Sequence, residues 1–160
     1  MAASTQPLST NLSWMLSHAS YTLTTELTAA LEQLGISPRA HCVLSAAATG
    51  EHTQTELAQM IGLDKTTLLV TLDELEAPGL AERRPSEKDR RVRVIAVTKA
   101  GESKLAEAEK IADRVQADVL EALSPDERKV FVDALGRLVS DRLAKPVVCA
   151  HPVRRRAPRG

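Results

Sequence analysis

The sequence feature that most constrains the fold is a pair of short helical segments joined by a glycine turn. Thr53, followed three positions later by Glu56, forms a capping-box signature that starts a helix over residues 54–61. Gly62 then permits a tight turn, and Asp64 caps a second helix with leucines at helical spacing along its buried face. These leucines are Leu68, Leu72 and Leu75. Two helices at this spacing predict a helix-turn-helix.

A β-hairpin is predicted directly after this unit, which Pro78 and Gly79 end. The runs GLAERR and VRVIAVT favour strands, and the polar stretch PSEKDR between them supplies a charged tip. Residues 83–94 carry six basic residues against Glu87 and Asp89. A helix-turn-helix followed by such a hairpin is a winged helix, whose second helix enters the DNA major groove while its wing contacts phosphates or the minor groove.

Apolar residues at helical spacing predict further helices on both sides of this unit. The first covers residues 8–34 and stops at Gly35. The next has Ser37 as its cap and Pro38 as its first residue, where the missing N–H costs nothing. Gly50 is expected to close this second helix.

Two longer helices complete the predicted fold. Thr98 caps the first, over residues 99–122, and a capping box formed by Ser124 and Glu127 starts the last, which runs to about Leu143. The fold class expected is therefore mainly α with a small β-hairpin wing (α+β). Residues 145–160 contain Pro, Arg and Gly without periodicity and are predicted to form a disordered basic tail.

Charge is distributed unevenly in a chain with 21 basic and 21 acidic residues. Residues 145–160 hold five of the basic residues and none of the acidic ones, so residues 1–144 carry a net charge of −5. The predicted second helix of the motif, residues 64–76, holds four acidic residues against Lys65 alone. The wing is therefore expected to supply most of the phosphate affinity and the helix most of the specificity.

The face of this helix opposite the leucines is expected to read the DNA groove. Threonine hydroxyls can contact phosphates or bases, and methyl groups of Thr or Val can contact the thymine methyl. Thr67 and Thr71 are expected at the margins of this face. The residues predicted to contact DNA are Lys65, Thr66, Thr67, Leu69 and Val70 in the helix and Arg83, Arg84, Lys88, Arg90 and Arg91 in the wing.

From about Leu8 to Leu143 the sequence resembles the MarR family of winged-helix transcription regulators. The matching positions are Leu75–Glu76, Gly79–Leu80 and Arg83 at the helix end, Asp89 and Arg91 at the wing tip, and Thr98 and Gly101 at the strand-to-helix junction. The LSPDE start of the last helix is also similar to the family. One departure is Ala77–Pro78, where the family often has charged residues, so the second helix is expected to end early.

The resemblance implies a homodimeric winged helix-turn-helix protein that binds a palindromic operator in double-stranded DNA. It implies a single domain over residues 1–144, with dimerisation helices at 8–35 and 99–143 and a DNA-binding lobe at 36–98. In the family's wing-arginine position, Arg91 would enter the minor groove, with Asp89 bracing it.

Many family members are repressors released by small phenolic or lipophilic ligands bound between the dimerisation helices and the DNA-binding lobe. The candidate pocket residues are Trp14, His18, Tyr21 and His41. Trp14 and Tyr21 also suit a dimer interface, where aromatic residues are enriched, so this alternative stays open.

Two other functions remain open from the sequence. One is a redox- or metal-responsive regulator on the same fold, and the other is a winged-helix module that binds proteins, which the acidic helix favours.

Cys42 is expected to be a buried, inert thiol. His18, His41, Glu26 and Glu107 lack the tight ligand spacing of a zinc site, so no metal or other cofactor is expected. A basic turn can also simply keep a hairpin soluble.

Several classes of protein are disfavoured. There is no Gly-rich phosphate loop, no paired-carboxylate arrangement tied to a base and no nucleophile motif such as G-x-S-x-G, which argues against an enzyme. Three aromatic residues are too few for a single-strand platform that stacks bases on rings. The sequence shows no signal-peptide hydrophobic region and no long apolar span, so a cytoplasmic protein without membrane contact is expected.

Overall fold

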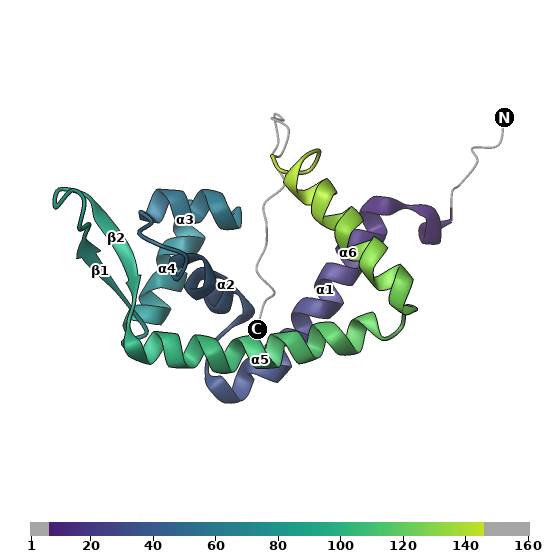
Figure 1. The fold of residues 1–160 in the computed structure, drawn as a ribbon, viewed down its shortest axis with the longest axis horizontal. Helices are drawn as coiled ribbons and strands as arrows, with labels where there is room; N and C mark the ends of the chain where they lie inside the picture. The colour runs from purple at the N-terminus through teal and green to yellow at the C-terminus, as the bar shows by residue number, and fades with distance from the viewer. Residues whose placement is uncertain (1–6, 146–160) are drawn as a thin grey trace. The chain divides into compact units, whose positions relative to one another are not determined.

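The helix-turn-helix and its wing form where the sequence places them. The computed structural model describes residues 7–145, and Figure 1 shows helices accompanied by one β-hairpin. The chain divides between Asp118 and Val119 into two compact units. Within the described residues, no helix combines the length and hydrophobicity needed to cross a membrane.

In chain order the elements are the 3-10 helix η1 (Leu8–Thr10), α1 (Leu12–Leu31), the 3-10 helix η2 (Glu32–Leu34), α2 (Pro38–Ala47), α3 (Gln54–Ile61), α4 (Lys65–Glu76), β1 (Ala81–Pro85), β2 (Arg93–Val97), α5 (Lys99–Leu120) and α6 (Pro125–Ser140). The strands pair antiparallel, with Ala81 opposite Val97 and Pro85 opposite Arg93. This arrangement confirms the predicted mainly α fold with a hairpin wing.

Both helices of the motif begin at the predicted caps. The Thr53 hydroxyl oxygen accepts a hydrogen bond from the Glu56 amide at 3.2 Å, and the Glu56 carboxylate accepts one from the Thr53 amide at 2.7 Å. Gly62 ends α3 with a φ of 71°, in the left-handed region that glycine adopts without steric cost. Asp64 then accepts a hydrogen bond from the Thr67 amide at 2.9 Å and starts α4.

The core of the first unit is aliphatic, and it includes the leucine face predicted for α4. The largest fully buried side chains are Leu31, Val43, Leu44, Leu57, Leu68, Thr71, Leu72 and Leu75. Leucine and valine fill this space because the aromatic side chains Trp14, Tyr21 and Phe131 all remain exposed. The core holds α2, α3 and α4 together and so fixes the surface that α4 presents.

Several element ends differ from the prediction. Residues 8–34 do not form one helix, because the Asn11 side chain accepts a hydrogen bond from the Trp14 amide at 2.9 Å and starts α1 anew. Helix α2 ends before Gly50, and α5 and α6 also end slightly short of their predicted limits. Apart from Lys145, the predicted basic tail lies outside the described residues.

The second unit contains α6, which begins at its predicted cap. The Glu127 carboxylate accepts hydrogen bonds from the amide and hydroxyl of Ser124, at 2.9 and 2.6 Å. Helix α6 has no buried residue, and several of its large apolar side chains are exposed. These side chains are Val130, Phe131, Val132, Leu138 and Val139.

A close contact joins the end of the hairpin to the start of α5. The Thr98 hydroxyl donates to the Gly79 carbonyl at 2.6 Å and accepts from the Gly101 amide at 3.0 Å. Gly101 packs so tightly that a Cβ atom there would lie 1.9 Å from the Leu80 carbonyl oxygen. The junction therefore requires a residue without a side chain at position 101, which explains the Thr-x-x-Gly spacing seen in the sequence.

This packing predicts that Gly101→Ala destabilises the fold, because the clashing atom is backbone and cannot rotate away. We expect a loss of about 1–3 kcal/mol in the free energy of unfolding, the usual range for overpacking, measured by urea denaturation followed by circular dichroism. Ser103→Ala, at an exposed position of the same helix, is the control and should change stability by less than about 0.5 kcal/mol. Equal stability of the two variants would show that the close contact is not required.

Candidate nucleic-acid interface

Helix α4 presents a short mixed polar and apolar surface. Lys65, Thr66, Leu69 and Val70, all predicted to contact DNA, are exposed on it. Thr67 is half-buried, and its hydroxyl donates to the Asp64 carboxylate at 2.7 Å, so this side chain serves mainly the helix cap.

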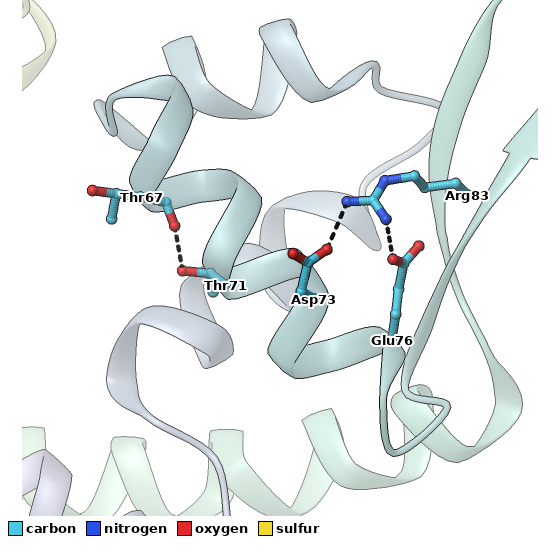
Figure 2. A network of polar contacts seen from close by, with 5 residues as sticks. All are labelled: Thr67, Thr71, Asp73, Glu76 and Arg83. Carbon is cyan, nitrogen blue, oxygen red and sulfur yellow. Dashed lines mark hydrogen bonds and ion pairs between the residues drawn. The ribbon is translucent and has the colours of Figure 1, made fainter.

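Thr71 does not lie at the margin of this surface, so that prediction is wrong. Its side chain is fully buried, and its hydroxyl donates to the Thr67 carbonyl one turn earlier at 2.8 Å, as Figure 2 shows. This bond satisfies the hydroxyl inside the core, where an unpaired polar group would be costly. The spacing of the leucines does not reveal that Thr71 is buried, because the buried face of α4 includes this threonine as well as the leucines.

Arg83 on β1 lies between two carboxylates of α4 (Figure 2). Its Nη2 is 3.1 Å from Asp73 Oδ1, and its Nη1 pairs with Glu76. The guanidinium group therefore offsets two of the acidic charges in the second half of α4. Because β1 carries this arginine, the same contact ties the first strand of the wing to the helix.

The basic wing is well exposed beyond this contact. Arg84, Lys88, Arg90, Arg91 and Arg93 are all exposed. Arg84 forms a long ion pair, at 3.6 Å, with the exposed Glu87, and such pairs contribute little in water. These side chains therefore form a positive surface that is free to meet phosphate groups.

The tip of the wing is ordered around Asp89. Its carboxylate accepts a hydrogen bond from the Arg91 amide at 3.0 Å and lies 3.7 Å from the Arg91 Nε. The Asp89 carbonyl also accepts a hydrogen bond from the Val92 amide at 2.9 Å, which closes the turn. The Arg91 side chain is 95% exposed, so it projects from an ordered turn into solvent.

Glu51, which sequence reasoning missed, holds the base of this tip. Its carboxylate accepts hydrogen bonds from the Glu87 amide at 2.9 Å and from the Ser86 hydroxyl at 2.7 Å. These bonds lower the pKa of Glu51 below its ordinary value, and the bond from the Glu87 backbone amide has the largest effect. The Glu51 carboxylate is therefore ionised at neutral pH. Ser86 is buried and in turn accepts a hydrogen bond from the Lys88 amide at 3.1 Å.

A second contact attaches the hairpin to the segment between α2 and α3 that contains Glu51. The Ile95 amide donates to the His52 carbonyl at 2.9 Å, forming an isolated bridge beside β2. Glu51 therefore holds the wing tip, and the next residue, His52, holds strand β2. No short-range sequence signal marks either contact.

The candidate ligand-pocket residues are only partly brought together. Trp14 and His18 stack on α1, with ring centroids 5.0 Å apart, and Tyr21 is exposed. The buried Nε2 of His41 on α2 has no hydrogen-bond partner among the described residues. One hollow among the described residues, of about 250 Å³, lies near the wing and is lined by Glu51, Arg84, Ile95 and others, not by these four.

Cys42 is exposed, so the prediction of a buried thiol is wrong for the single chain. It lies on the side of α2 away from the buried Val43 and Leu44. Desolvation nevertheless raises the pKa of Cys42, which reduces the reactive thiolate at neutral pH. Among residues 7–145, no group of three or more histidine, cysteine or carboxylate side chains could hold a metal ion.

Comparison with solved structures identifies the same architecture. The chain is 32% identical to the transcriptional regulator PA3341, with a TM-score of 0.71, over 82% of this chain and 97% of that one. It is 26% identical to CouR from Rhodococcus jostii RHA1 bound to p-coumaroyl-CoA, with a TM-score of 0.77, over 86% of this chain and 96% of that one.

The CouR repressor has also been solved on a 23-mer DNA duplex, and that structure matches with 26% identity and a TM-score of 0.76, over 87% of this chain and 99% of that one. A family model described as the MarR family matches residues 34–92, which span α2, the helix-turn-helix and the wing up to its tip. The exposed surface of α4, the basic wing and the sequence similarity therefore agree, and the chain belongs to the MarR family of transcriptional regulators.

Proposed function

We propose that this protein is a cytoplasmic, homodimeric repressor that binds a palindromic operator in double-stranded DNA and is released by a small-molecule ligand. The observation that carries the proposal is the basic wing, exposed and ordered, beside the exposed surface of α4. Residues 1–144 carry a net charge of −5, so one strongly positive element among them is a localised site for a polyanion. The resemblance to a repressor solved on a DNA duplex supports the same reading.

In this proposal α4 lies in the major groove and the wing follows the backbone. Lys65, Thr66, Leu69 and Val70 face the base edges, and Thr67 contributes from the cap at the helix N-terminus. Arg84, Lys88 and Arg90 neutralise phosphates, while Arg91 enters the minor groove from the turn that Asp89 orders. Arg83 differs from the other wing residues, because its guanidinium is engaged by α4, and we assign it a positioning role.

The homodimer is supported by apolar side chains that the single chain leaves in water. Leu8, Leu12, Trp14 and Met15 are exposed near the start of α1, and α6 buries none of its residues. Exposed apolar surface of this extent marks an interaction site. A second copy is the partner that the family resemblance implies, and its two-fold symmetry would match a palindromic operator.

The effector is proposed to be a small aromatic or lipophilic molecule. Support comes from the stacked Trp14–His18 pair and from the unpartnered Nε2 of His41, which offers one polar group beside apolar surface. Pockets of this kind combine apolar walls with a few polar groups that fix orientation. The p-coumaroyl-CoA thioester bound by CouR makes hydroxycinnamoyl compounds reasonable first probes.

The proposed DNA contact predicts that Arg91→Ala weakens binding to every duplex. The variant should lose about tenfold in affinity, and its salt dependence should fall by about one unit of slope, because one phosphate-region contact is removed. The measurement is fluorescence anisotropy over a salt series, with the DNA upstream of the protein's own gene as the duplex. Lys65→Ala should instead change the preference among sequences.

Arg114→Ala, at an exposed position of α5, is the control and should bind like the wild type. Absence of binding by the wild type to this upstream DNA at low salt would contradict the proposed function.

The proposed dimer predicts a solution mass of about twice the 17.3 kDa of one chain. Phe131→Glu should lower this mass toward that of the monomer, because a charge would replace an apolar contact between copies. Gln59→Glu, at an exposed position of α3 outside the dimerisation helices, should leave the mass unchanged. Sedimentation velocity distinguishes these outcomes, and a monomeric wild type at micromolar concentration would refute the dimer.

A further inference from the structure

The reading surface of α4 lacks the side chains that usually identify bases. Guanine is read most often by arginine and adenine by asparagine or glutamine. Residues 64–76 contain none of these, and Lys65 is the only cation in the segment. The direct contacts available to the first half of α4 are therefore lysine to guanine, threonine to several bases, and apolar contact with the methyl group of thymine.

The carboxylates of α4, which are Asp73, Glu74 and Glu76, all lie in its second half, beyond the N-terminal part of a recognition helix that contacts base edges. Asp73 lies on the exposed side of the helix and could in principle accept a hydrogen bond from cytosine. However, its Oδ1 pairs with Nη2 of Arg83 from β1, 3.1 Å away, which offsets its charge and restrains its orientation. Glu76 is held by the same guanidinium group.

The apolar side chains of this surface are placed for a different contact. Leu69 is 43% exposed and Val70 is 52% exposed, and neither belongs to the buried core. Thr66 lies three and four positions before them and therefore shares their face of the helix, where its own methyl group extends the apolar surface. All three residues belong to the first half of α4, the part of a recognition helix that contacts base edges.

The charges around this patch indicate what covers it. The wing that follows α4 exposes Arg84, Lys88, Arg90, Arg91 and Arg93, a surface complementary to phosphate groups. A nucleic acid brought to the wing would place its major groove over the patch, and thymine is the base that carries a methyl group there. We infer that Leu69 and Val70, with the Thr66 methyl group, form a thymine-methyl recognition site that determines which operators this regulator prefers.

This inference rests on the proposed DNA-binding function and names what its reading helix selects. The full chain would be used to enrich duplexes from a random library copied with thymidine triphosphate. We expect thymine at symmetric positions in the two half-sites of the enriched duplex. Replacing thymine by uracil at those positions removes only the methyl group and keeps the base pairing. Each such change should weaken binding about fourfold, as expected for one buried methyl group.

Variants of the protein identify which side chains make the contact. Leu69→Ala and Val70→Ala should each lower the affinity for the thymine duplex and change the affinity for the uracil duplex little. The ratio of the two affinities should therefore fall toward one. Two control variants should leave the preference intact. Met60→Ala shortens an exposed apolar side chain on α3, and Arg91→Ala should weaken both duplexes equally.

The outcomes separate the inference from the function beneath it. Equal affinity for thymine and uracil duplexes, or full preference retained by both α4 variants, would overturn the inference and leave DNA binding intact. Failure of the wild type to enrich any duplex at low salt would overturn the proposed function as well. A preference lost in the α4 variants and kept in the two controls would establish the site.

Discussion

The contact between Arg83 and the carboxylates of α4 is the interaction on which the proposed DNA-binding surface depends. In the proposed complex, a helix whose only cation is Lys65 would bring Asp73, Glu74 and Glu76 toward a polyanion. A single guanidinium group from β1 engages two of these three carboxylates. The contact also fixes the first strand of the wing against the helix, so charge compensation and geometry come from one side chain.

Further contacts make the wing an ordered element of the first unit. Glu51 holds the tip through Ser86 and the Glu87 amide, and the His52 carbonyl pairs with β2. The absence of a side chain at Gly101 lets α5 start directly against the end of the hairpin. Groups that are ordered before binding lose less conformational freedom when they bind, so in the proposed function these contacts would favour DNA affinity.

The sequence predicted the elements well because their signals are local. The caps at Thr53, Asp64 and Ser124 start helices, and the turn at Gly62 ends one. Each depends only on residues a few positions away in the sequence. The site is different, because its key contacts join distant positions. Glu51 and Ser86 are 35 residues apart, and the basic run at 83–94 does not reveal that Arg83 serves the helix while its neighbours face solvent. Periodicity places a residue on a face, but it does not assign its ion pair.

The positioning role of Arg83 is tested most directly by a double-mutant cycle on DNA affinity. Arg83→Ala is measured alone and in a background carrying Asp73→Asn and Glu76→Gln, with the enriched duplex and fixed salt. If Arg83 acts through the carboxylates, its loss should weaken binding in the wild type and have much less effect once they are neutral. An equal loss of affinity in both backgrounds would contradict the account, because it would show that Arg83 contacts the DNA directly.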